Sequence, residues 1–260
     1  MNVCALCLKH VREVGALKLS HIYPRFMLLL SKQEGKSVLY NYQGKDVQLG
    51  QYDWKEYLLC GQCEHHIKHH EDFLKEVLYS RRSTTQERVS DSEYEVHASS
   101  NAVALAVLTI LWRGCITNLP EFKDLRVVTA NGRELLRTWI YNNSLPSDWK
   151  YYVAMKISEA TVAGDRVEFI FQPHFHRISD VTACVVLTVG GYIFEITMPV
   201  PLGYDHVGTA SLIPNSRSFS ITKVELSTIP SFKAAIDHAM SLDVSEELQD
   251  RIDKLPRRRK

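Results

Sequence analysis

Two pairs of closely spaced cysteines are the residues of this chain whose types and spacing most clearly predict chemistry. Cys4 and Cys7 form one Cys-x-x-Cys pair, and Cys60 and Cys63 form another. Two intervening residues let a tight turn direct both sulfurs at one ion about 2.3 Å away, and two such pairs complete a tetrahedron. The spacing therefore predicts a structural Zn²⁺ site that staples the segment between the pairs.

Other readings of these thiols are open. They could be buried free cysteines, or one pair could be a redox couple. A thioredoxin-like pair follows a strand within a βαβ unit, whereas only Met1 to Val3 precede Cys4. Disulfides are not expected, because no apolar leader follows Met1 and six cysteines without one indicate a reducing compartment, the cytoplasm.

The composition is that of an ordinary globular protein. The chain has 260 residues, of which 45% are hydrophobic and 23% charged, enough for one large domain or two smaller ones. The formal net charge is only +1, so any surface for nucleic acid must be local. The longest apolar run, Ala102 to Trp112, is shorter than the roughly 20 residues that span a bilayer. We therefore expect a soluble protein with no membrane partner.

Residues 1–80 are expected to form a small zinc module. Leu17 to Ile22 has the spacing of a short strand that Pro24 ends, and Phe26 to Leu30 resembles a buried helical turn. Val38 to Leu49 predicts a hairpin around Gly44, and a helix should start at the second cysteine pair. A knuckle, a hairpin and a helix in this order make up a treble-clef or ββα-metal arrangement. Because so short a segment buries little surface, the metal should supply much of its folding free energy.

Two further motifs carry a resemblance to a known family. Ser20-His21-Ile22-Tyr23-Pro24 follows the first cysteine pair, and Leu58-Leu59 precedes the second pair, which Glu64 follows. In this order the motifs resemble the HNH nucleases, and more closely a group of bacterial HNH-like zinc proteins. The resemblance covers about the first third of the chain. It implies a metal-dependent endonuclease that cleaves nucleic acid, with DNA favoured, in bacterial defence against phage.

The resemblance also implies roles for single residues. His21 matches the histidine that acts as general base and activates water. Ser20 stands where the family has a ligand to the catalytic ion, and Glu64 stands where it has a metal-binding histidine. The asparagine that orients the base would fall near Lys55. Of these four positions, His21 alone keeps the family's residue.

The residue types still allow a hydrolytic site. Phosphodiester hydrolysis needs a base with a near-neutral pKa, which His21 offers, and a hard cation. Glu64 is an oxygen ligand suited to Mg²⁺ or Mn²⁺. Glu71 lies on the same helix face as Glu64, together with apolar residues. The two carboxylates are therefore either ligands or orienters of His21, or they pair with Arg25, Arg12 or Lys18 in structural salt bridges.

Four histidines on the same helix form two pairs at i, i+4, the spacing at which two imidazoles can hold one ion. The pairs are His65 with His69 and His66 with His70. An exposed polar face is the alternative interpretation of all four. If one pair binds the catalytic ion, we expect it to be His66 and His70, which flank Glu64 and Glu71.

Residues 81–100 read as a linker or mobile loop, because the segment is rich in serine, threonine and charge. Its arginines Arg81, Arg82 and Arg88 either touch phosphates or belong to a solvated connector.

Residues 101–260 are expected to form a larger α+β region of helices followed by an antiparallel sheet. A buried helix should run from Asn101 to Trp112, with Gly114 as its stop, and Arg113 should anchor a phosphate or an internal carboxylate. A second helix should start at Asn131, and Gly190-Gly191 predicts a hairpin turn. The predicted strands and a closing helix cover the ranges Tyr151 to Ile157, Arg166 to Phe171, Thr182 to Val189, Tyr192 to Val200, Phe219 to Leu226 and Ile229 to Met240.

No motif in the larger region names a reaction. Pro173 to His176 is expected to be a turn with two surface histidines, and Cys115 and Cys184 are expected to be core thiols. The region could bind a protein partner, sense a ligand or grip nucleic acid. The basic tail, like Arg25, could contact phosphates or could simply keep the chain soluble. The tail residues are Arg257, Arg258, Arg259 and Lys260.

Two functions from different classes follow. The first is a metal-dependent HNH-type endonuclease with structural zinc, His21 as base and Glu64 as ligand to a second ion. The second is a non-catalytic, zinc-stapled module that binds nucleic acid or protein. The retained His21, Glu64 and the carboxylate face of the helix favour the first, and Ser20 and Lys55 favour the second.

Overall fold

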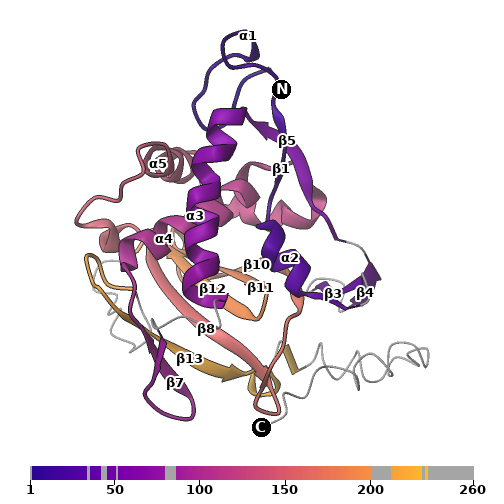
Figure 1. The fold of residues 1–260 in the computed structure, drawn as a ribbon, viewed down its shortest axis with the longest axis vertical. Coiled ribbons are helices and arrows are strands. Elements are labelled where there is room, and N and C mark those ends of the chain that lie inside the picture. The colour runs from indigo at the N-terminus through magenta and orange to yellow at the C-terminus, as the bar shows by residue number, and fades with distance from the viewer. Residues whose placement is uncertain are drawn as a thin grey trace.

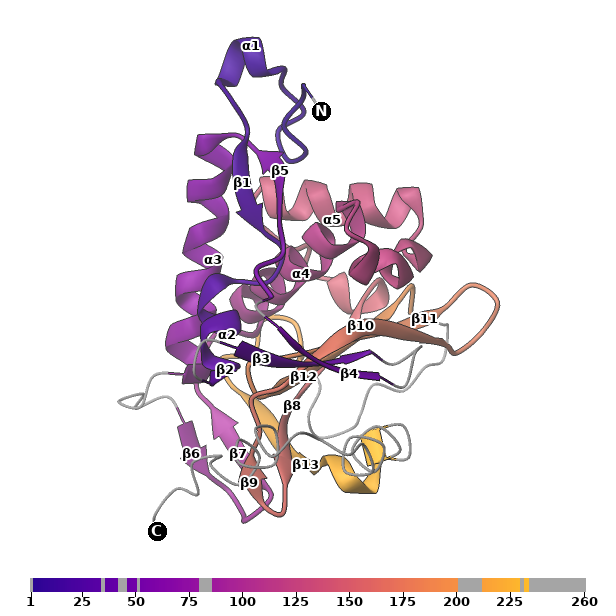
Figure 2. The ribbon, with the colours of Figure 1, turned by 90° about the vertical axis from the view of Figure 1, so that its right-hand side faces the viewer.

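A computed structural model describes residues 2–33, 36–41, 46–50, 52–79, 86–200, 212–229 and 232–233. The fold is mixed α and β, with a layer of helices against one large sheet and a smaller two-stranded ribbon beside the longest helix (Figures 1 and 2). This agrees with the predicted α+β class. Within the described ranges, no single helix is long and apolar enough to cross a membrane.

The N-terminal elements surround the cysteine pairs. The ribbon consists of β1 (Lys18–His21) and β5 (Lys55–Leu59), paired antiparallel, and α3 (Gly61–Tyr79) starts directly after Cys60 as predicted. Two short helices accompany them, α1 (Val11–Val14) and α2 (Arg25–Leu30).

The large sheet has eleven strands. Their order is β2-β3-β10-β11-β12-β8-β13-β7-β6, with β4 on β3 and β9 on β8. Most pairs are antiparallel, but β3–β10 and β8–β13 are parallel. The strands are β2 (Lys32–Gln33), β3 (Lys36–Asn41), β4 (Asp46–Gly50), β6 (Gln86–Arg88), β7 (Glu93–Val96), β8 (Ala154–Val162), β9 (Asp165–Arg166), β10 (Ile170–Arg177), β11 (Ala183–Val189), β12 (Tyr192–Met198) and β13 (Phe219–Glu225).

The Gly190-Gly191 turn joins β11 to β12 as predicted, with Val189 opposite Tyr192. Both glycines have positive φ, 61° and 85°. A Cβ on Gly190 would lie 2.6 Å from the Tyr79 hydroxyl, so glycine is needed here both for the turn and for the close approach of α3.

The helical layer is built around α4 (Ser100–Ile116), whose aliphatic residues are buried on nearly every side. Ser99 caps its start by accepting from the Ala102 amide. α5 (Ala130–Tyr141) and two 3₁₀ segments, η1 (Pro120–Val127) and η2 (Trp149–Tyr151), complete the layer. A third 3₁₀ segment, η3 (Leu226–Thr228), follows β13, and its Leu226 belongs to a second apolar cluster. The prediction that the helix stops at Gly114 is wrong, because α4 continues to Ile116. A Cβ at Gly114 would lie 2.5 Å from a Leu125 methyl, so glycine is needed here to let η1 pack against the helix.

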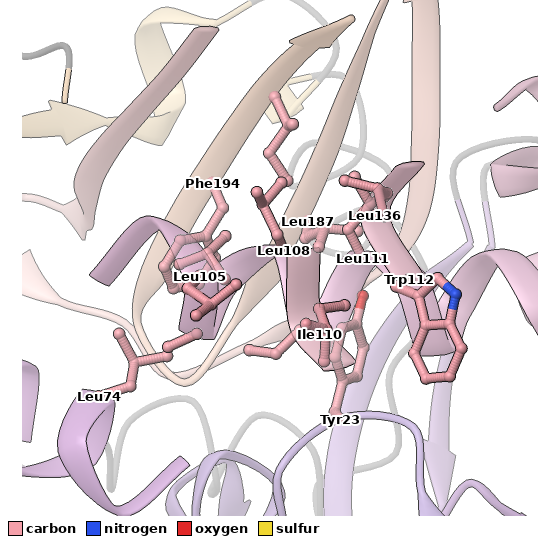
Figure 3. Packing of buried hydrophobic residues seen from close by; sticks show 14 of the residues in the cluster. Tyr23, Leu74, Leu105, Leu108, Ile110, Leu111, Trp112, Leu136, Leu187 and Phe194 are labelled. Carbon is pink, nitrogen blue, oxygen red and sulfur yellow. The ribbon is translucent and has the colours of Figure 1, made fainter. Parts of the chain in front are cut away.

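One hydrophobic core joins the N-terminal elements to the larger region. Figure 3 shows Leu108 and Leu111 of α4 among side chains from several elements. The neighbours that the figure labels include Tyr23, Leu74 of α3, Leu136 of α5, and Leu187 and Phe194 of the sheet. Each such side chain contributes about 2 kcal/mol when fully buried, so this contact stabilises both parts of the chain together.

Several expectations for the segments between these elements need correction. The described part of 81–100 contains β6 and β7, and β7 pairs with β13, so it belongs to the sheet rather than to a bare linker. Residues 167–169 are not strand, although Val167, Phe169 and Phe171 share one apolar cluster as predicted. His174 and His176 lie within β10 rather than in a turn. Arg81, Arg82, the turn at Gly44, most of the predicted closing helix and the tail Arg257–Lys260 lie outside the described residues.

Candidate metal centre and histidine site

The four predicted zinc ligands come together. The sulfurs of Cys4, Cys7, Cys60 and Cys63 all lie within 4.8 Å of one another. The first pair lies in the turn before α1, and the second pair lies at the start of α3. Backbone bonds fold the first turn tightly, since the Cys4 amide donates to the Lys9 carbonyl and the Leu8 amide to the Cys4 carbonyl, both at 2.9 Å.

The surroundings of Cys4 favour the thiolate, the form that binds metal, whereas burial raises the pKa of Cys7 and the hydrogen bond with Cys4 raises that of Cys63. A hydrogen bond from Cys63 and backbone amides, among them Cys60 N at 3.3 Å, hold the pKa of Cys4 below its usual value. A four-thiolate set of this kind fits zinc, which would act here as a structural staple. Cys115 and Cys184 are separate, buried thiols whose pKa values are raised by burial, as expected of core cysteines.

The β1–β5 ribbon positions His21. In the antiparallel register His21 lies opposite Lys55, and the Ile22 amide donates to the Trp54 carbonyl at 2.9 Å. The His21 Nε2 atom lies 3.0 Å from Asp53 Oδ1, and Lys55 Nζ lies 2.5 Å from Asp53 Oδ2. Burial and then Lys55 lower the pKa of His21, while Asp53 acts against them. The imidazole is therefore neutral near pH 7, as a general base must be.

Glu64 contacts the opposite face of the ribbon. The Ser20 hydroxyl, which is completely buried, donates to the Glu64 carboxylate. Successive side chains of a strand point to opposite faces, so Ser20 faces α3 while His21 faces away from it. Burial raises the pKa of Glu64. The carboxylate that touches His21 is therefore Asp53, and the expected pairing of His21 with Glu64 is replaced.

Glu71 pairs with Arg113 of α4. The Arg113 guanidinium lies 2.6 Å from Glu71 Oε1, and its other terminal nitrogen donates to the His21 backbone carbonyl, also at 2.6 Å. The Arg113 side chain is only 2% exposed, so this charge needs its partner. Arg113 thus binds an internal carboxylate, one of the two predicted roles, and the partner of Glu71 is Arg113 rather than Arg25, Arg12 or Lys18.

The histidines of α3 divide between two environments. His66 Nε2 lies 2.7 Å from the Ile140 carbonyl of α5, and His70 is buried, with a pKa lowered to about 4 by burial and then by His66. His65 and His69 are exposed, as the alternative interpretation of the helix predicts.

The residues expected to bind a second, catalytic ion do not come together in one site. In the part of the chain that the structure describes, the four cysteines are the only group of three or more His, Cys, Asp or Glu side chains able to hold an ion. Glu64 instead bonds to a residue of β1, Glu71 to a residue of α4, and His66 to a carbonyl of α5. The expected Mg²⁺ or Mn²⁺ site from these residues and His70 is therefore not supported.

Polar contacts fasten the cysteine knuckle and the ribbon to the helical layer. The Glu56 carboxylate accepts three hydrogen bonds, from the Thr117 hydroxyl at 2.6 Å and from the amide and side chain of Asn118 at 2.8 and 2.7 Å. Arg137 of α5 donates to the Leu6 carbonyl at 2.7 Å. His21 is therefore held on a support that both parts of the chain build.

The sequence reasoning missed Asp53. Only the first of the two paired strands was predicted, and the register of β1 with β5, which places the residues just before Lys55 beside His21, comes from the tertiary structure. Arg25 is exposed at the start of α2, where the predicted phosphate contact stays untested. Comparison with known proteins returned no match to a family model, a curated protein or a solved structure.

Proposed function

We propose that the protein is an HNH-like endonuclease that hydrolyses phosphodiester bonds of nucleic acid, with His21 as general base. The observation that carries this is the His21–Asp53 contact of 3.0 Å, on the face of the ribbon that points away from α3. A neutral imidazole held by a carboxylate is the arrangement that takes a proton from water. The cysteine site, the ribbon and α3 support a treble-clef module as the frame of this site.

The chemistry assigns a role to each neighbour. When His21 Nε2–H points at Asp53, Nδ1 carries the lone pair and accepts a proton from water. The water oxygen then bonds to phosphorus as the P–O bond to the leaving oxygen breaks, and solvent protonates that oxygen. Lys55 places a cation beside this pair, where it stabilises charge developing on the phosphoryl oxygens. We assign no step to a divalent ion, because the described side chains gather no set for one.

The decisive assay incubates plasmid DNA with wild type, His21→Ala and Asp53→Asn, with Mg²⁺, with Mn²⁺ and with neither ion. His21→Ala should lower the rate by about 10²–10⁴-fold, the usual contribution of a general base. Asp53→Asn should lower it less and shift the pH profile, because it orients the ring. His176→Ala, which alters an exposed histidine on β10, is the matched control. Equal cleavage by wild type and His21→Ala would contradict the proposal.

A second candidate is a non-catalytic, zinc-stapled module that binds nucleic acid or protein. The engagement of Glu64, Glu71 and His66 by protein groups favours it, because these contacts leave no second-ion set. No cleavage under any ion, combined with retained binding of nucleic acid, would select this candidate. Zinc content should be measured in every variant, so that a lost staple is not mistaken for a lost base.

A further inference from the structure

The turn that carries the first cysteine pair is held from outside by Arg137 of α5. Arg137 Nη1 donates to the Leu6 carbonyl at 2.7 Å, and Leu6 lies between Cys4 and Cys7 in the sequence. The Arg137 side chain is only 16% exposed, so this bond is largely shielded from water. A contact from a distant helix to the backbone between two metal ligands influences how the turn presents its sulfurs.

Glu134 fixes the direction in which Arg137 points. The Arg137 Nε and Nη2 atoms donate to the two carboxylate oxygens of Glu134 at 2.8 and 2.6 Å. The planar guanidinium can make these contacts and still present Nη1 to Leu6. Glu134 is 58% exposed, so water screens the negative partner more strongly than the cation.

The backbone of the first cysteine turn needs support. Leu8, directly after Cys7, has a φ of 59°, in the left-handed region that is costly for a residue with a Cβ. Such conformations persist only where surrounding contacts hold them. The Leu8 amide, which donates to the Cys4 carbonyl, supplies one contact from within the turn. Arg137 supplies another from the larger region.

A cation beside this turn also balances charge. Four thiolates carry more negative charge than Zn²⁺ neutralises, so a filled site is a negative centre. Glu134 is the main cause that raises the pKa of Arg137, and the Cys7 sulfur, when ionised, adds to this effect. The guanidinium therefore lies within electrostatic reach of a ligand sulfur.

The second cysteine turn has a cation beside it as well. A Cβ on Gly61, which lies between Cys60 and Cys63, would be 3.5 Å from Lys18 Cε. Lys18 is exposed, whereas Arg137 is largely shielded, so water and salt weaken the effect of Lys18 more. Each turn thus has a positive side chain next to the residues that separate its two cysteines.

We propose that Arg137, with a smaller contribution from Lys18, raises the affinity of the four-cysteine site for Zn²⁺ as a positioning residue that is not itself a ligand. Its bond to Leu6 holds the turn in shape, and its charge stabilises the negative centre. Because Arg137 belongs to α5, residues 1–80 do not complete the metal centre alone. The inference depends on the four-cysteine site and is independent of the role of His21.

The test measures zinc occupancy of the full chain in buffers whose free Zn²⁺ is set by a chelator, with bound zinc read by elemental analysis after gel filtration. Arg137→Gln should need about tenfold more free Zn²⁺ for half occupancy, the usual effect of removing such a partner. Arg137→Lys keeps the charge and should recover part of this loss. Lys18→Gln should shift half occupancy by about threefold or less, because its charge is screened.

Arg133→Gln is the matched control. Arg133 is half-buried on the same helix and also donates to a carbonyl, that of Val128 just before the helix, at 3.0 Å. It should bind zinc like wild type. Urea unfolding of each variant at saturating Zn²⁺ adds a second measurement, because a role in stability alone would lower the urea midpoint and leave half occupancy unchanged.

Each outcome supports or overturns the proposal. Equal half occupancy in wild type and Arg137→Gln would overturn it, and so would an equal loss in Arg133→Gln. No recovery in Arg137→Lys would also overturn it, because the charge would then contribute nothing. A wild type that binds no zinc would overturn both this proposal and the structural zinc site. The plasmid assay does not bear on it, so loss of the nuclease proposal would leave it standing.

Discussion

The thiols at the start of α3 and the carboxylates and imidazoles farther along it meet different neighbours. The four sulfurs face one another within 4.8 Å, and two of them come from a turn that backbone hydrogen bonds close. Along the helix, Glu71 meets Arg113 and His66 meets the Ile140 carbonyl. Thiolates have few good partners in a protein other than a metal, whereas carboxylates and imidazoles have many. Side chains that could bind a metal stay available for it only where no protein group binds them instead.

The largest expected effect tests the cysteine set. Cys60→Ser should reduce bound zinc from about one per chain to none and lower the melting temperature by about 10 °C or more, because metal binding supplies folding free energy. Elemental analysis and thermal unfolding measure the two effects. Cys184→Ser, which changes a buried cysteine of β11 outside the cluster, should keep its zinc. A Cys60→Ser protein that holds zinc and melts like wild type would contradict a structural zinc site at the four cysteines.

The next effect tests the buried ion pair. Arg113→Met should lower the free energy of unfolding by about 3 kcal/mol, because it leaves Glu71 and the His21 carbonyl without their cation. Urea unfolding measures it. The double variant with Glu71→Leu should regain part of the loss, because no charge is then left unpaired. Arg88→Met, which breaks an exposed pair with Asp91, should change stability by less than about 1 kcal/mol. Equal losses in Arg113→Met and Arg88→Met would make the buried pair no more important than the exposed one.

A smaller effect tests the buried histidine through pH. The pKa of His70 is lowered to about 4 in the folded state, below the value near 6.5 expected of the unfolded chain. The unfolded chain therefore binds more protons between these values, so stability should fall by about 2 kcal/mol as the pH drops from 6.5 to 4. In His70→Leu the urea midpoint should fall less over this window, and His176→Leu should behave like wild type. A His70→Leu protein as acid-sensitive as wild type would place the effect elsewhere.

Local patterns predicted elements whose determinants are neighbours in sequence. Examples are the Cys-x-x-Cys spacing, the Gly-Gly turn and the apolar run of α4, each of which is determined by residues within the segment itself. Pairings between distant segments were not predictable in this way. The parallel contact of β3 with β10 and the addition of β7 to β13 depend on which edges the folded sheet leaves open. The same holds for Gly114, which reads as a helix stop until Leu125 is seen to pack against it.

The candidate site shows the same division. The position of His21 followed from its motif, but its partner Asp53 follows from the strand register and the partner of Glu71 from the packing of α3 on α4. A helix face holds ligand candidates at the right spacing whether or not an ion is present. Only the tertiary neighbours decide whether a carboxylate is free to bind one.

The smallest expected effect concerns the solvent side of α3, where His65 and His69 lie with ring centroids 4.7 Å apart. Replacing either exposed histidine by alanine should raise stability slightly, by about 0.5 kcal/mol or less, because alanine is the better helix former and no buried contact is lost. Zinc per chain should stay unchanged, as measured by titration with a chromogenic chelator. A second equivalent of zinc that His69→Ala abolishes would reverse the comparison. It would show that the imidazoles able to hold an ion on α3 are those that the protein leaves unbonded in water.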